Sequence, residues 1–173
     1  LLAGQPVTVL RDAEALGEAL GAGRDYALVK ITPAHLELLE PQLAPQDVGR
    51  AARCYVVGGE ALLGESLAFW RAHAPDLRIV NEYGPTETVV GCCVYEVPSG
   101  PIPPGPVPIG RPIPRTTLHV LDGQMEPVLP GVAGEVDQID TGHVRKRPFE
   151  ICHHEIVLRR DGAVHRAVAR HAI

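Results

Sequence analysis

The residues from Asn81 to Thr88 carry the side chains of this sequence that are best suited to chemistry. The segment reads Asn-Glu-Tyr-Gly-Pro-Thr-Glu-Thr. Tyr83 offers a flat face to a nucleobase, and Asn81 both donates to and accepts from a base edge. Thr86 can bond a phosphate oxygen, and Glu87 can hold Mg²⁺. These residue types therefore suit a nucleotide bound together with a magnesium ion.

The elements that must position this segment are two apolar runs on either side of it. Residues 77–80 read Leu-Arg-Ile-Val, and residues 88–95 form a second run that is also typical of a strand. Between them, Gly84-Pro85 breaks both helix and strand, so the chain must turn there. A turn at the end of a buried strand is where α/β proteins place many ligand sites.

The first 97 residues alternate between strand patterns and helix patterns. This alternation predicts an α/β fold: a largely parallel sheet layer with flanking helices. Asp12 is the predicted cap of the first helix, Thr32 with Pro33 begins the second, and Pro41 ends it early. Apolar residues recur at helical spacing from 61 to 74. The predicted strands lie at residues 7–10, 26–31, 54–57, 77–80 and 88–95.

The pattern changes after residue 97 to a smaller, β-rich portion. Residues 98–114 are rich in Pro and Gly and predict an ordered, mostly extended surface loop. Residues 116–121 predict a strand followed by a turn at Asp122-Gly123, and residues 156–164 predict a hairpin. We therefore divide the chain into an α/β subdomain (1–97), a loop and β subdomain (98–136) and a degenerate tail (137–173) whose sequence pattern allows more than one alignment.

Composition excludes several classes of protein. The 173 residues are 45% apolar with a net charge of −5, which indicates a globular protein and predicts no binding to nucleic acid or membranes. Neighbouring residues on a strand point to opposite faces, so Cys92 and Cys93 are poor disulfide partners for each other. We expect a reduced, cytoplasmic protein. The opening residues 1–4 are expected to lie inside a longer polypeptide.

The segment from Asn81 to Thr88 resembles the Asn-x-Tyr-Gly-Pro-Thr-Glu motif of adenylate-forming enzymes, specifically nonribosomal peptide synthetase adenylation domains. Four neighbouring runs follow in the order of that family and extend the resemblance over residues 1–136. They are Val-Val-Gly-Gly-Glu-Ala-Leu at 56–62, Pro-Ile-Gly-Arg-Pro-Ile at 108–113, Val-Leu-Asp at 120–122 and Pro-Gly-Val-Ala-Gly-Glu-Val at 130–136.

The resemblance implies ATP-dependent activation of a carboxylic or amino acid as an acyl-adenylate, followed by transfer to a carrier-protein thiol. The implied cofactors are ATP or AMP with Mg²⁺, and the implied partners are a carrier protein or neighbouring megasynthase domains. The implied nucleotide-binding residues are Gly58, Gly59, Asn81, Tyr83, Gly84 and Thr86, with Glu87 on the metal. The implied acyl pocket is Lys30, Val56, Gly58, Glu82, Val90 and Gly91. Lys30 is expected to pair either with Glu82 or with a substrate carboxylate.

Two elements of the family do not occur in the sequence: the Ser/Thr/Gly-rich phosphate loop and the catalytic lysine of the far C-terminal loop. We therefore assign no catalytic residue and expect no adenylate formation by the chain alone. Three hypotheses stay open: a truncated or degenerate adenylation domain, a non-catalytic platform in a megasynthase, and one part of a split enzyme. The sequence most similar to the family's Thr-Gly-Asp motif lies at residues 141–143, where His143 stands in place of the aspartate.

Residues 152–155, Cys-His-His-Glu, together with His143, raise the question of a metal site. Cysteine and histidine are metal ligands, but no second spaced pair accompanies them. We interpret them as polar residues on a strand or loop.

Overall fold

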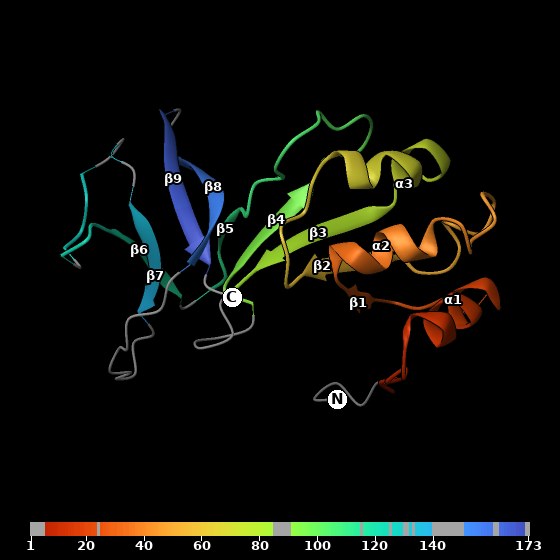
Figure 1. Ribbon diagram of the computed structural model, residues 1–173. Helices are drawn as coiled ribbons and strands as arrows, with labels where there is room; N and C mark the ends of the chain where they lie inside the picture. Colours follow the sequence, from red (N-terminus) through yellow and green to blue (C-terminus); the bar gives the residue numbers. More distant parts are fainter. Residues whose placement is uncertain are drawn as a thin grey trace.

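The computed structural model describes residues 6–23, 25–84, 91–114, 116–124, 126–129, 132, 134–139, 151–160 and 163–171, the strands from 135 onward by their backbone. The elements alternate along the first half of the chain and are all strands thereafter (Figure 1). Their order is α1 (Ala13–Gly21), β1 (Val29–Ile31), α2 (Pro33–Leu39), β2 (Cys54–Gly58), the 3₁₀ turn η1 (Glu65–Leu67), α3 (Ala68–His73), β3 (Arg78–Tyr83), β4 (Cys93–Val97), β5 (Arg111–Pro112), β6 (Thr117–Leu121), β7 (Glu135–Ile139), β8 (Ile151–Arg160) and β9 (Ala163–His171).

The central sheet has five strands in the order β1-β2-β3-β4-β5. Strands β1 to β3 run parallel, whereas β4 and β5 are antiparallel to their neighbours. The α/β class is confirmed, but the sheet is mixed rather than largely parallel. The reason is the short connection after β3: a parallel crossover needs a dozen or more residues, usually with a helix, and only nine residues separate β3 from β4.

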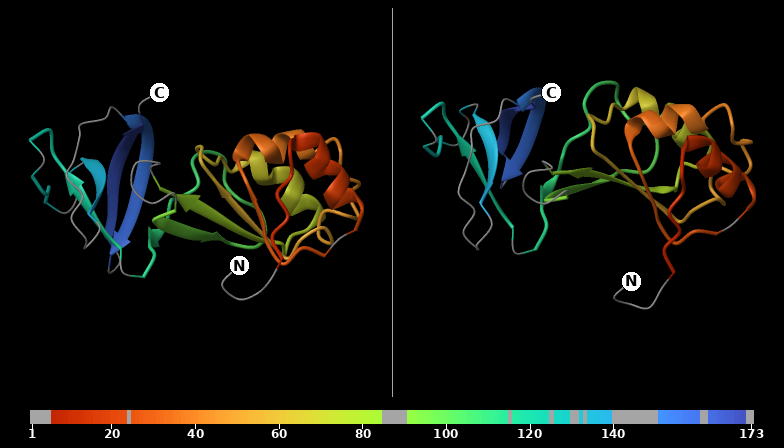
Figure 2. Two further views of the ribbon diagram at one scale, coloured as in Figure 1. Left: turned by 90° about the horizontal axis from the view of Figure 1, so that it is seen from below. Right: turned by 60° about the horizontal axis from the view of Figure 1, so that its bottom comes forward.

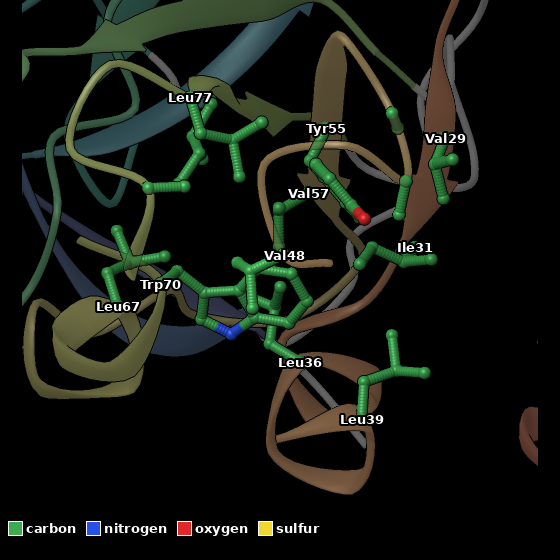
Figure 3. Close-up of a cluster of buried hydrophobic side chains, with 14 of the residues drawn as sticks. Val29, Ile31, Leu36, Leu39, Val48, Tyr55, Val57, Leu67, Trp70 and Leu77 are labelled. Atoms are coloured by element: carbon green, nitrogen blue, oxygen red, sulfur yellow. The ribbon is translucent and has the colours of Figure 1, made fainter. Parts of the chain in front are cut away.

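The three helices lie on one face of this sheet (Figure 2). Their apolar sides and the inward-facing strand residues form a single core, in which Tyr55 and Trp70 are fully buried with ring centroids 5.1 Å apart (Figure 3). The strand residues of this face are Val29, Ile31, Tyr55, Val57 and Ile79. The alternate residues of the same strands point to the other face, which no described helix covers.

The predicted starts of the first two helices are confirmed. The Asp12 carboxylate accepts a hydrogen bond from the backbone N–H of Ala15 at 2.8 Å, which caps α1. Thr32 caps α2, with Pro33 at its first position, and α2 ends at Leu39, two residues before Pro41.

Two predicted elements differ from the structure. Residues 7–10 are not a strand, and Val7 and Val9 are 62% and 88% exposed. Their alternating pattern was not sufficient, because a strand also needs a partner and none of the described residues pairs with them. The predicted helix 61–74 is instead the 3₁₀ turn η1 from residue 65 followed by α3 from residue 68. The residues before η1 run beside a later segment, where Leu63 pairs with Pro106 in an isolated bridge.

Residues 98–110, called the proline loop below, contain no helix, but they are not simply a surface loop as predicted. Val107 and Ile109 are buried, and the backbone N–H of Val107 donates to Leu62 O at 2.9 Å. The backbone N–H of Gly105 donates to the Glu65 carboxylate at 2.7 Å, which lowers the pKa of that carboxyl. The proline loop is therefore held by hydrogen bonds to the segment that follows β2, and it leads into the edge strand β5.

The remaining strands form two antiparallel pairs, β6 with β7 and β8 with β9. The predicted strand at 116–121 and the terminal hairpin are confirmed. At the predicted turn, the Asp122 carboxylate accepts from the backbone N–H groups of Gln124 and Glu126. The division into 1–97, 98–136 and 137–173 stays a prediction. None of the described helices is long and apolar enough to cross a membrane.

Candidate functional site

The predicted site residues that the structure describes lie at or near the edge where the three parallel strands end. Because β1, β2 and β3 run in the same direction, their carboxyl ends meet at one edge of the sheet. Gly58 is the last residue of β2 and lies opposite Glu82, and Tyr83 is the last residue of β3. The strand register therefore brings together residues that are more than twenty positions apart in the sequence.

An ion pair lies on the face of the sheet that the helices leave open. The Lys30 ammonium donates to the Glu82 carboxylate, and the two side chains are 44% and 21% exposed. The sequence left two partners open for Lys30, Glu82 or a substrate carboxylate, and in the structure Lys30 pairs with Glu82. Val56 lies on the strand between them, in register with Lys30, and is partly buried.

Two glycines leave space for this ion pair. A Cβ atom at Gly58 would lie 2.5 Å from Glu82 O and 3.1 Å from Lys30 Nζ, and a Cβ at Gly91 would lie 2.5 Å from the Glu82 carboxyl carbon. Gly59 has φ +92°, a conformation that favours glycine. The glycines therefore let the strand ends and the ion pair approach closely.

Asn81 and Tyr83 point to the opposite face from Glu82, since side chains alternate along β3. Asn81 is 4% exposed, and its side-chain nitrogen donates to Pro108 O at 2.9 Å and Val107 O at 3.4 Å. Sequence reasoning assigned this side chain to a base edge and missed its contact with the proline loop, because no local pattern links residues that lie 27 positions apart.

Tyr83 is half-buried beside a small apolar cluster formed by Cys92, Cys93 and Ile109. The backbone N–H of Cys92 donates to Tyr83 O at 2.8 Å. Both thiols are fully buried and free, in agreement with the prediction that they do not form a disulfide with each other. A hydrogen bond between the thiols, followed by burial, raises the pKa of Cys93, and the same bond lowers the pKa of Cys92. They support the tyrosine rather than act as exposed nucleophiles.

Several predicted site residues lie outside the described residues: Thr86, Glu87 and Val90, as does His143 of the possible metal cluster. Gly84 is described and partly buried. Among the side chains that the structure describes, no group of three His, Cys, Asp or Glu residues could hold a metal ion. The roles of the site residues stay predictions.

Comparison with known proteins identifies the family. The AMP-binding enzyme model matches residues 8–137, so the chain belongs to the AMP-binding enzyme family. It is 35% identical over 154 residues to bacitracin synthase 3 of Bacillus licheniformis and 36% identical over 141 residues to tyrocidine synthase 3 of Brevibacillus parabrevis. These matches cover 84% and 79% of this chain but only 2% of each synthase.

The fold has counterparts among solved structures. Holo-PA1221, an NRPS protein containing adenylation and PCP domains, matches with a TM-score of 0.65 and 24% sequence identity. The match covers 92% of this chain and 28% of that chain. At this level of identity the likeness shows the fold alone, and it agrees with the mixed sheet and flanking helices described above. The sequence matches and the fold likeness thus agree in relating the chain to nonribosomal peptide synthetases.

Proposed function

We propose that this chain forms the part of an adenylation domain that binds the base and phosphates of ATP and one side of an acyl substrate. The reaction of the assembled domain would join a carboxylic or amino acid to the AMP portion of ATP with release of pyrophosphate. The thiol of a carrier protein would then take the acyl group with release of AMP. The observation that carries this proposal is the convergence of Gly58, Glu82 and Tyr83 at the carboxyl ends of adjacent parallel strands, where the motif that begins at Asn81 leaves β3.

In the proposed site, Tyr83 stacks on adenine, and Gly84 continues the chain toward the phosphates. Thr86 bonds the α-phosphate and Glu87 holds Mg²⁺. Mg²⁺ bound with a nucleotide commonly uses one or two protein carboxylates together with phosphate oxygens and water, so a single glutamate is a sufficient donor set.

The proposed acyl pocket lies on the open face of the sheet and is lined by Lys30, Val56, Gly58, Glu82, Val90 and Gly91. Its described wall is polar, because the Lys30–Glu82 ion pair forms part of it. A substrate carboxylate would have to compete with Glu82 for the Lys30 ammonium. The proposed partners are a carrier protein and neighbouring megasynthase domains, and the buried thiols fit the reducing cytoplasm.

The test is calorimetric titration of this chain with ATP·Mg²⁺. We expect Tyr83→Ala and Glu87→Ala each to weaken binding, the former by roughly fivefold to a hundredfold because stacking on a base contributes about 1–3 kcal/mol. Glu96→Gln alters a carboxylate on β4 away from the strand ends, so it should bind as the unmodified chain does. No binding at millimolar nucleotide by folded protein would refute the proposal and favour a non-catalytic platform.

A further inference from the structure

The side-chain nitrogen of Asn81 has acceptors for both of its hydrogens within the protein. Pro108 O lies 2.9 Å away and Val107 O lies 3.4 Å away. Because Asn81 is only 4% exposed, these contacts are made in a buried setting, where an unsatisfied carbonyl is costly. The nitrogen is therefore committed to the proline loop and is not available to a base edge.

This contact continues to the ring of Tyr83. Ile109 follows Pro108 directly and is 5% exposed. Its side chain belongs to the apolar cluster against which Tyr83 packs. One end of the proline loop is thus held by Asn81, two residues before Tyr83 on the same strand, and the loop returns to support that tyrosine.

We propose that Asn81 is a positioning residue, which ties the proline loop to β3 and so places Ile109 behind the adenine-binding face of Tyr83. The proposal rests on the proposed nucleotide site for its functional half, whereas the anchoring of the loop stands on the described contacts. It predicts that Asn81 affects how tightly a purine nucleotide binds without its nitrogen deciding which purine binds.

The experiment compares ATP with inosine triphosphate, in which an oxygen replaces the amino group of adenine, on the unmodified chain and on Asn81→Ala. We expect both affinities to fall by the same factor, roughly fivefold to tenfold for the loss of one buried hydrogen-bonding group. We also expect faster amide hydrogen exchange in residues 98–110. Glu65→Ala is the matched control, because it releases the loop at Gly105 and leaves the Asn81–Pro108 contact in place.

Three results would overturn the proposal. A ratio of the two affinities that changes by more than about threefold would mean that Asn81 reads the base directly. Unchanged affinities together with faster loop exchange would leave Asn81 a purely structural role. Unchanged hydrogen exchange in the proline loop of Asn81→Ala would show that Asn81 does not anchor this loop.

Two provisions keep the test decisive. If Asn81→Ala does not fold, Asn81→Thr carries the same comparison, since its hydroxyl is too short to reach Pro108 and threonine suits a strand. If the unmodified chain binds neither nucleotide, the proposed function and the positioning role toward Tyr83 both fail. Loop exchange in Asn81→Ala then still shows whether the anchor exists.

Discussion

Replacing Gly58 with alanine tests whether the close approach of the strand ends is as tight as the structure has it. The added Cβ would lie 2.5 Å from the backbone oxygen of Glu82, well short of the 3.4 Å at which ordinary van der Waals contact begins. This neighbour is a backbone atom of the last β2–β3 pair, so it cannot rotate away as a side chain would. The strands must shift relative to each other.

The expected cost follows from this geometry. Overpacking a well-packed site destabilises by about 1–3 kcal/mol. In a chain of this size, 1 kcal/mol changes the melting temperature by about 2–4 °C, so Gly58→Ala should lower Tm by roughly 2–12 °C. The assays are urea denaturation and thermal melting followed by circular dichroism. The variant should also weaken ATP binding if the proposed site is correct.

The matched control is Gly21→Ala at the end of α1, where an added Cβ meets nothing within 4 Å. Alanine restricts the unfolded chain and favours the helix, so this control should be neutral or more stable by about 0.4–1 kcal/mol. If Gly58→Ala is as stable as the control, the strand ends are not packed closely and the geometric argument for Gly58 is wrong.

Three further predictions follow from the core, the surface and the thiols. Trp70→Ala removes a fully buried ring and should cost about 3–5 kcal/mol in urea denaturation, whereas Leu38→Ala, at a half-exposed position, should cost little; equal effects would contradict the assigned core. The hydrogen bond from Arg53 lowers the pKa of Asp25 from 3.8, so this pair stabilises the fold above that pH and its contribution is lost as the pH falls through the lowered folded value; Asp25→Asn should flatten the acid limb of a stability–pH curve, and at 1 M salt the difference should vanish. Cys92 and Cys93 should resist alkylation at pH 8 until urea unfolds the chain, as mass spectrometry of the labelled peptides can establish, and rapid labelling of native protein would show that the cluster behind Tyr83 is open.

Local signals in the sequence were sufficient for the elements that position the site. The helix that begins after Asp12 and the strand that ends in Gly58 each depend on residues within a few positions, namely a cap, a run of apolar side chains and a glycine pair. Such features act before any long-range contact forms, so the pattern alone identifies them.

The features that the sequence could not supply all depend on distant partners. Residues 7–10 alternate as a strand would but have no described neighbour to pair with, and the direction of β4 depends on how the chain turns after β3. The contact between Asn81 and Pro108 joins two motifs that were each recognised separately. Periodicity states which face of an element is apolar, but it does not state which element lies against that face.

The position of the Lys30–Glu82 ion pair at the strand ends is more informative than its contribution to the stability of the fold. An ion pair with side chains 44% and 21% exposed contributes between nothing and about 1 kcal/mol, because water screens the charges and ordering two long side chains costs entropy. The fold nevertheless places glycine on both sides of it, at Gly58 and Gly91, where any side chain would collide with strand β3 or the Glu82 carboxylate. Glycine within or beside a sheet weakens it, so these two positions indicate that the fold accepts some loss of sheet stability in order to fit the ion pair against the strand ends. A partly exposed charged pair at the carboxyl ends of parallel strands is an arrangement suited to holding a polar ligand. It follows that Lys30→Met should change which acyl substrates bind far more than it changes the free energy of unfolding.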